Sequence, residues 1–278
     1  MIVTRFAPSP TGLLHLGHAF SALVAYQAAR EAGGRFLLRI EDIDPVRCKP
    51  EYTQAIFTDL AWLGLAWEEP VRCQSDHGAD YAAALDRLRE MGLLYPCACT
   101  RRQIGELAAP QENDEAGPVY PGTCRGLPEA ARAELAQTRA CVWRLDMAQA
   151  CARVGGLTWH DAGRGEVVAD PGRFGDIVLA RKDVPTSYHV SVTVDDALQG
   201  VSLVTRGEDL LAATDIHRLL QALLGLPTPR YRHHPLLRDA SGRRFAKRDK
   251  ALTLRALRQA GRSPQDVREM VGFGDFSL

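Results

Sequence analysis

Apolar and polar positions over residues 1–40 alternate in a way that predicts a strand, a helix and a second strand. An apolar run over 1–6 leads into a proline-rich turn, and apolar residues then recur at helical spacing over 19–31. Gly33 and Gly34 end this helix, and residues 35–40 form a second apolar run followed by acidic residues. A strand, a helix and a strand of this length form a right-handed βαβ unit of a parallel sheet.

The same patterns continue along most of the chain. Apolar residues at helical spacing predict further helices over 51–63, 79–91, 214–224, 252–260 and 263–271. Short apolar runs predict strands over 141–145, 165–168, 176–181 and 201–209, and a helix-compatible segment begins at Ser187.

These elements predict an α/β protein whose main part is a Rossmann-type parallel-sheet domain in two halves, residues 1–93 and 183–235. A smaller subdomain, residues 94–182, is expected between the halves, because its strands are short and their connections irregular. Residues 236–278 are expected to form a loop and a short helical segment.

Length and composition are those of an ordinary globular protein. The 278 residues carry no net formal charge, and no apolar run approaches the ~20 residues of a membrane span. The opening residues lack the arrangement of a signal peptide and the seven cysteines are odd in number, so we expect a reduced, cytoplasmic protein without membrane contacts. No coiled-coil pattern stands out, and a monomer is expected. Residues 228–278 carry twelve Lys and Arg against five Asp and Glu, which suits a polyanion contact or a solvated basic tail.

The turn after the first strand is a candidate binding site. Residues 5–18 read Arg-Phe-Ala-Pro-Ser-Pro-Thr-Gly-Leu-Leu-His-Leu-Gly-His and lead directly into the first helix. A helix N-terminus offers unpaired backbone N–H groups to a phosphate. His15 and His18 share a face there, and Gly17 lets a flat base approach the backbone. We interpret the turn as a nucleotide triphosphate site, with a structural histidine pair as the alternative.

Charged residues at two strand ends are further candidates. The acidic cluster 41–44 follows the second strand, at the same edge of the sheet as the opening turn. It could hold a substrate ammonium or Mg²⁺, or pair with Arg39 and Arg47. Arg206 also ends a strand, where it could bind a carboxylate in a fork or pair with the acidic residues that follow it.

Three cysteines have the spacing of a small zinc knuckle. Cys97, Cys99 and Cys124 lie within 28 residues, and zinc takes four ligands. No histidine lies between Cys99 and Cys124, so Tyr120, Asp114 or a residue from elsewhere would complete the shell. Buried free thiols are the alternative, and the other four cysteines show no ligand spacing.

A loop rich in cations follows the last predicted strand. Residues 241–248 read Ser-Gly-Arg-Arg-Phe-Ala-Lys-Arg. A loop of this kind can close over a triphosphate and stabilise charge on the leaving pyrophosphate. A basic surface loop without such a role is the alternative.

Together these segments resemble the class I aminoacyl-tRNA synthetases in their glutamate-specific form. Residues 5–18 resemble the first signature of that class and residues 39–44 the next block of the same enzymes. Residues 63–67 and 206–210 are further matches, and residues 244–248 take the place of the second signature, Lys-Met-Ser-Lys-Ser. The resemblance runs in order over nearly the whole chain.

The sequence departs from that pattern in two ways. Arg244 and Ala246 replace the first Lys and the Ser of the second signature, but Lys247 remains, so activity is expected. The chain also ends thirty residues after Arg248, where glutamyl-tRNA synthetases continue into an anticodon-binding domain. The resemblance is therefore to their truncated paralogues, which lack that domain and glutamylate the queuosine of tRNA(Asp).

The resemblance implies a reaction and a set of site residues. Glutamate and ATP, with Mg²⁺, would form glutamyl-adenylate without tRNA, and the glutamyl group would pass to the cyclopentene diol of queuosine at the wobble position of tRNA(Asp). The residues implied to bind glutamate are Arg5, Phe6, Ala7, Pro8, Ser9, Glu41, Tyr188 and Arg206. Those implied to bind ATP are His15, Gly17, His18 and Lys247, and the catalytic ones among them are His15, His18 and Lys247. One structural Zn²⁺ would be held by Cys97, Cys99, Tyr120 and Cys124.

Other functions remain open on the sequence alone. A truncated glutamyl-tRNA synthetase would charge a tRNA 3′ end instead. A nucleotidyltransferase acting on a small molecule would share the His-x-Gly-His tetrapeptide. A non-catalytic tRNA-binding paralogue would need neither His15, His18 nor Lys247, all of which are present.

Overall fold

The computed structural model describes residues 1–107, 119–137, 141–237 and 253–274. Its first sheet is parallel, in the order β1 (Val3–Phe6), β2 (Arg35–Ile40), β3 (Glu68–Cys73). Helix α1 (Leu16–Glu31) connects β1 to β2, and α2 (Pro50–Trp62) connects β2 to β3. The predicted βαβ unit is confirmed.

A second sheet has the order β7-β6-β10-β9. Strands β9 (Leu203–Gly207) and β10 (Arg230–His234) are parallel, and α8 (Ala213–Leu224) connects them. Strands β6 (Thr158–Asp161) and β7 (Gly165–Val168) form an antiparallel hairpin, and β6 pairs with β10. The segment expected to form a separate insert therefore contains a hairpin that belongs to this sheet.

The two sheets meet at β1 and β9. The backbone N–H of Ser202 donates to Val3 O at 3.0 Å, and the N–H of Val3 donates to Ser202 Oγ at 2.9 Å. From this junction the first sheet extends to one side and the second to the other. Ligands in parallel α/β sheets bind where the strand order reverses in this way, at the carboxyl ends of the strands.

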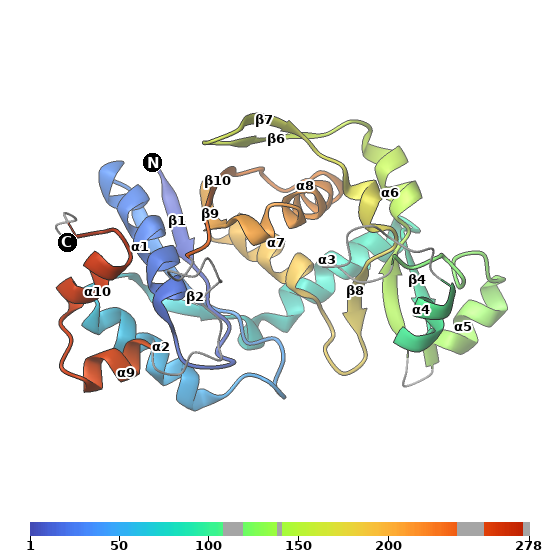
Figure 1. Ribbon diagram of the computed structural model, residues 1–278. Coiled ribbons are helices and arrows are strands. Elements are labelled where there is room, and N and C mark those ends of the chain that lie inside the picture. The colour runs from blue at the N-terminus through green and yellow to red at the C-terminus, as the bar shows by residue number, and fades with distance from the viewer. Residues whose placement is uncertain (108–118, 138–140, 238–252, 275–278) are drawn as a thin grey trace.

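A third, antiparallel sheet lies towards the opposite end of the molecule from α1 (Figure 1). It has the order β4 (Leu94–Cys97), β5 (Val142–Leu145), β8 (Val178–Arg181). Helices α4 (Arg101–Leu107) and α5 (Glu129–Gln137) lie beside it.

Helices join this third sheet to the parallel sheets. A second apolar core forms where α3 (Gly78–Glu90), α6 (Met147–Val154) and α7 (Tyr188–Leu198) pack with α8. Its fully buried members include Leu88, Leu219 and Leu220, and burial of each such leucine contributes about 1.5–3 kcal/mol.

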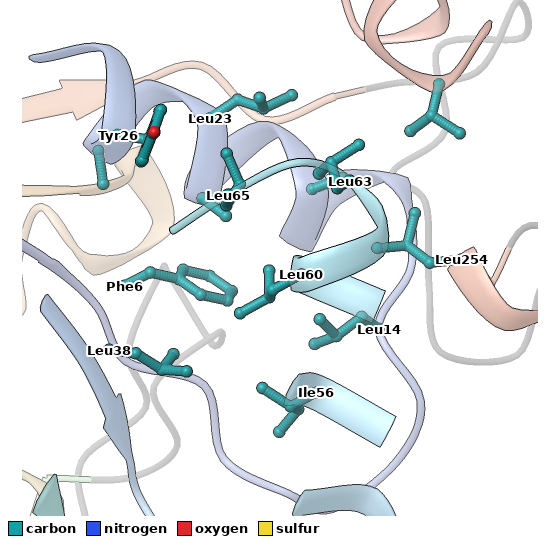
Figure 2. Close-up of a cluster of buried hydrophobic side chains, with 14 of the residues drawn as sticks. Phe6, Leu14, Leu23, Tyr26, Leu38, Ile56, Leu60, Leu63, Leu65 and Leu254 are labelled. Atoms are coloured by element: carbon teal, nitrogen blue, oxygen red, sulfur yellow. The ribbon is translucent and has the colours of Figure 1, made fainter. Parts of the chain in front are cut away.

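The main core covers the face of the first sheet on which α1 and α2 lie (Figure 2). It also receives residues from α9 (Leu254–Gln259) and α10 (Pro264–Met270), near the C-terminus. The N–H of Leu254 donates to Leu14 O at 2.8 Å, so the start of α9 is fixed to the turn that precedes α1. No helix of the described residues is both long and apolar enough to cross a membrane.

Two of the strands absent from the sequence prediction, β3 and β10, have polar or irregular sequences. Strand β10 reads Arg-Tyr-Arg-His-His, and β3 is a largely exposed edge strand that contains Pro70. Such runs lack the apolar signal on which strand prediction rests, because tertiary contacts stabilise them instead.

Candidate active site

A cavity of about 540 Å³ lies at the carboxyl ends of β1, β2 and β9. It brings together eleven of the residues singled out from the sequence: Arg5, Phe6, Ala7, Pro8, Ser9, His15, Gly17, His18, Glu41, Tyr188 and Arg206. Lys247 and the rest of the second signature lie outside the described residues. The segments before and after that signature reach the same region, since Leu237 lines the cavity and Thr253 forms an isolated β-bridge with His15.

The two histidines form the N-terminal cap of α1. His15 is the N-cap residue, and its Nδ1 accepts from the N–H of Gly17 at 3.1 Å. His18 Nδ1 accepts from the N–H of His15 at 3.2 Å, and the two rings stack with centroids 3.8 Å apart. A Cβ at Gly17 would lie 3.0 Å from the His15 ring, so glycine is what allows this close packing.

This cap fixes how the rings face the cavity. Because each Nδ1 accepts a hydrogen bond, the neutral form of each ring carries its proton on Nε2. His15 and His18 therefore both have an Nε2–H donor, next to the positive end of the α1 dipole. The arrangement suits the oxygens of a phosphate.

Glu41 is the only residue of the acidic cluster 41–44 among those that line the cavity. Its Oε1 lies 3.7 Å from Nε of Arg39, whose side chain is fully buried. Burial raises the pKa of Glu41 to about 7, although Arg39 and Arg5 favour the charged form. Close to neutral pH this carboxyl group can become the charged partner of a substrate ammonium.

The other two acids of that cluster have structural roles. Asp42 accepts from the N–H and the hydroxyl of Ser75, at 2.9 and 2.7 Å. Asp44 Oδ1 accepts from the backbone N–H groups of Val46 and Arg47. The cluster therefore divides into one cavity residue and two that fix local backbone.

Arg5 reaches the cavity from β1 and is backed by a carboxylate. Its Nε donates to Asp196 Oδ1 at 3.0 Å, and its Nη1 donates to Thr205 O at 3.2 Å. Asp196, from α7, also accepts from Arg39 at 2.7 Å. Burial opposes the charge on Asp196, but Arg5 and Arg39 outweigh it and lower its pKa.

Arg206 lies across the cavity on β9 and has different neighbours. Among the described residues it makes no ion pair, so the alternative of a pair with Glu208 or Asp209 is not what the structure shows. Its guanidinium instead donates to uncharged groups, including Tyr188 Oη at 3.4 Å. A buried cation without a carboxylate partner suits an anionic ligand.

A second polar cluster is far from the cavity, at the end of β4. The Sγ atoms of Cys97, Cys99 and Cys124 all lie within 4.8 Å of one another, a grouping that could hold a metal ion. The Oη of Tyr120 lies 3.4 Å from Cys97 Sγ and 3.6 Å from Cys99 Sγ. The alternative ligand Asp114 lies outside the described residues.

The comparisons with known proteins agree with this geometry. The family model described as "tRNA synthetases class I (E and Q), catalytic domain" matches residues 1–273. The chain belongs to the class I tRNA synthetases. A glutamyl-Q tRNA(Asp) synthetase from Rhodobacter capsulatus is 52% identical over 98% of this chain and 100% of that protein. One from Nocardia farcinica is 46% identical over 95% of this chain and 81% of that protein.

A solved relative of this class I synthetase is a glutamate tRNA ligase from Elizabethkingia meningosepticum, crystallised in complex with its amino acid. It matches 89% of this chain with a TM-score of 0.74 and 28% identity. The chain spans about half the length of that ligase, 52%.

Several polar residues of this class I synthetase's site were absent from the sequence prediction. Asp196 supports Arg5, and His217, His233 and Thr214 contact Arg206. Arg39, which the sequence offered as a pairing partner of the acidic cluster, does lie beside Glu41. The only sequence signal was the pair Asp195 and Asp196, near the end of the apolar segment that begins at Ser187, where an unpaired charge is costly. Nothing local marks the partners of Arg206.

Proposed function

We propose that this chain activates glutamate with ATP and transfers it to the queuosine of tRNA(Asp). The observation that carries the proposal is the 52% identity to the Rhodobacter capsulatus glutamyl-Q tRNA(Asp) synthetase over the whole of that protein. The cavity supports it, since it combines two buried arginines, one carboxyl group and a helix N-terminus.

Glutamate carries two carboxylates and one ammonium, and the cavity offers a partner for each. Arg5 and Arg206 are the proposed carboxylate partners and Glu41 the proposed ammonium partner. Both arginine residues are buried, at 5% relative exposure, where a charge-assisted hydrogen bond contributes about 1.5–3 kcal/mol. Phe6, Ala7, Pro8, Ser9 and Tyr188 complete the proposed glutamate site.

ATP, as its Mg²⁺ complex, would place its phosphates at the start of α1. The Nε2–H groups of His15 and His18 would donate to phosphate oxygens, while Gly17 keeps the backbone accessible. Lys247 would stabilise charge on the leaving pyrophosphate. It lies outside the described residues, and its support is that Leu237 and Thr253, on either side of its segment, adjoin the cavity.

The proposed first step joins glutamate to AMP. An oxygen of the α-carboxylate attacks the α-phosphorus of ATP, and the bond to the bridging oxygen of pyrophosphate breaks. In the second step a hydroxyl of the queuosine cyclopentene diol attacks the activated carbonyl carbon. AMP leaves with the anhydride oxygen, and the hydroxyl proton is released.

The cysteine cluster, Cys97, Cys99 and Cys124 with Tyr120, is proposed to hold one structural Zn²⁺. Tetrahedral zinc with Zn–S bonds of ~2.3 Å separates its sulfurs by ~3.8 Å. The Sγ atoms of Cys99 and Cys124 are 3.6 Å apart, which fits. With Tyr120 as fourth ligand, no position would remain for a substrate, which is why the proposed role is structural.

The deciding experiment measures transfer of labelled glutamate to tRNA(Asp) with and without queuosine, using the whole chain. We expect labelling only of the tRNA that carries queuosine, and glutamate-dependent exchange of pyrophosphate into ATP without any tRNA. Labelling of queuosine-free tRNA would overturn the proposed acceptor and favour charging of a 3′ end. Absence of glutamate-dependent exchange would overturn the proposed activation.

A further inference from the structure

The guanidinium of Arg206 is held by side chains that carry no charge. Its Nε donates to His233 Nε2 at 3.2 Å and its Nη1 lies 3.1 Å from His217 Nδ1. Its Nη2 donates to Thr214 Oγ1 at 2.6 Å, and its face lies 5.5 Å from the ring centre of Tyr231. All these groups position the cation without neutralising it.

The positions of the protons on His233 and His217 follow from all the hydrogen-bond partners of each ring. His233 Nδ1 lies 2.7 Å from Asp161 Oδ2, so the proton sits on Nδ1 and leaves Nε2 as the acceptor for Arg206. Arg206 can only donate, so His217 Nδ1 accepts from it, and the proton of the neutral His217 ring then sits on Nε2, 3.2 Å from His189 Nδ1. Each imidazole therefore presents a lone pair to the guanidinium.

The histidines are kept in the neutral form by their surroundings. Burial lowers the pKa of His217 well below its usual range, and Arg206 lowers it further. Burial lowers the pKa of His189 to about 4, with Arg206 acting in the same direction. Burial and Arg206 also lower the pKa of His233 to about 4, although Asp161 opposes the shift. At neutral pH the only formal charge in this group of contacts to Arg206 is its own.

Arg5 shows how a buried arginine is held when a carboxylate does neutralise it. It donates to the carboxylate of Asp196, which it shares with Arg39. A carboxylate placed in the same way beside Arg206 would satisfy the guanidinium before a substrate arrives, and an incoming carboxylate would then gain much less from it.

We propose that Thr214, His217 and His233 are positioning residues that hold Arg206 while leaving its charge for the side-chain carboxylate of glutamate, and that they thereby set the preference for glutamate over glutamine. This inference rests on the proposed function. The α-carboxylate loses its negative charge when the anhydride forms, so a fixed cation on it would oppose the step. The side-chain carboxylate keeps its charge throughout, and an uncompensated buried cation suits it.

The test compares two substitutions that differ in one charge. In His217→Asn the side-chain oxygen replaces Nδ1 as a neutral acceptor, and in His217→Asp the oxygen in the same place carries a negative charge. We expect the KM for glutamate in pyrophosphate exchange to be at least about tenfold higher in the Asp variant than in the Asn variant. The preference for glutamate over glutamine, as a ratio of kcat/KM values, should fall with it, while the KM for ATP stays the same in both.

A second pair of variants tests the same role without requiring that the His217→Asp variant folds. Thr214→Val deletes the hydroxyl that accepts from Nη2, whereas Thr214→Ser keeps it. We expect the Val variant to raise the KM for glutamate about 3- to 10-fold without changing that for ATP, and the Ser variant to restore it. His160→Asp, at an exposed histidine beside Arg230, controls for the added charge and should leave both KM values unchanged.

The outcomes separate this inference from the proposed function. A wild-type chain that activates glutamate, together with equal KM values for the Asn and Asp variants and for the Val and Ser variants, would overturn the positioning role alone. A wild-type chain with no glutamate-dependent exchange and no glutamate binding by calorimetry would overturn the proposed function, and this inference with it.

Discussion

The cavity and the cysteine cluster assemble their polar groups over very different distances along the chain. In the cavity, Arg5 is bonded to Asp196, 191 residues away, and to the carbonyl of Thr205. In the cysteine cluster, residues within 28 positions converge on one point. The cavity therefore depends on the packing of the first and second sheets against each other, whereas the cysteine cluster depends on one strand end and one short segment.

The two sites also differ in what their polar groups require. The cysteine cluster brings three sulfur atoms close to one another, an arrangement that a single metal cation would satisfy. The cavity holds cations and a carboxyl group that are only partly paired with each other, so several ligand groups are needed to complete it. Damage to one site should therefore leave the other intact, and the predictions below separate the two.

Asp196→Asn should have the largest effect, because it breaks the buried pairs with Arg5 and Arg39 at once. We expect the free energy of unfolding to fall by about 3–5 kcal/mol in a urea titration, and glutamate-dependent exchange to be lost. Metal content should not change. Asp183→Asn, which touches only an exposed pair with Arg181, is the matched control and should stay within about 0.5 kcal/mol of wild type.

Cys124→Ser should damage the cysteine cluster and spare the cavity. Loss of a residue that only hydrogen-bonds to a metal ligand lowers metal affinity about 10- to 100-fold. We expect the loss of a ligand itself to lower zinc affinity by more than this, as measured by metal competition. Glutamate-dependent exchange should continue, because no residue of the cluster lines the cavity. Cys151→Ser, on α6, is the control and should retain zinc. Equal metal content in the two variants would contradict the proposed ligand set.

The pH dependence of glutamate use should report on Glu41, whose pKa is raised to about 7 chiefly by burial. Below that pH the ionised fraction falls about tenfold per unit, so the KM for glutamate should drop about tenfold from pH 6 to pH 8. Because the folded pKa lies above the unfolded value, the contribution of Glu41 to stability is present at low pH and is lost as pH rises through about 7. Glu41→Gln should bind glutamate weakly and show no such slope. A KM that is flat in wild type would contradict the assignment.

The smallest effect is expected within the cavity, from Ser21→Ala. Ser21 Oγ lies 3.0 Å from His234 Nε2, and the Nδ1 of that ring lies 3.0 Å from Pro235 O. Loss of this support should raise the KM for ATP about 2- to 5-fold without affecting that for glutamate. Thr58→Val, at an exposed hydroxyl on α2, should change neither. A rise in both constants would show that the pair acts on the whole cavity.

What the sequence could predict follows the same division. The opening turn and the cysteine spacing are local, so residues three to thirty positions apart were enough to find them. The turn-to-helix context of His15 and His18 was correct, but their place in a capping box was not foreseen, because histidine is an uncommon N-cap residue. Tyr120, the proposed fourth zinc ligand, was one of several alternatives until the family resemblance favoured it.

The supporting residues of the cavity could not be found in this way. Asp196 contacts Arg5 from helix α7, 191 residues away, and His233 contacts Arg206 from the neighbouring strand β10, which the sequence did not predict. Strand β10 supplies His233 and yet has no apolar pattern, since Arg230 and Arg232 are exposed and Tyr231 is its one member of a hydrophobic cluster. Sequence reasoning therefore found residues that line the cavity and missed several that hold them in place.

The bond between Asp161 and His233 has one more consequence. Asp161 ends the first strand of the β6–β7 hairpin, a segment that the sequence had placed outside the parallel-sheet domain. Anything that binds the hairpin and shifts this carboxylate would alter how His233 holds Arg206. Thermodynamic linkage is reciprocal, so glutamate would then change the affinity of the hairpin for its ligand by the same factor. A ligand of the hairpin would thus be coupled to occupancy of the proposed amino-acid site through Asp161 and His233.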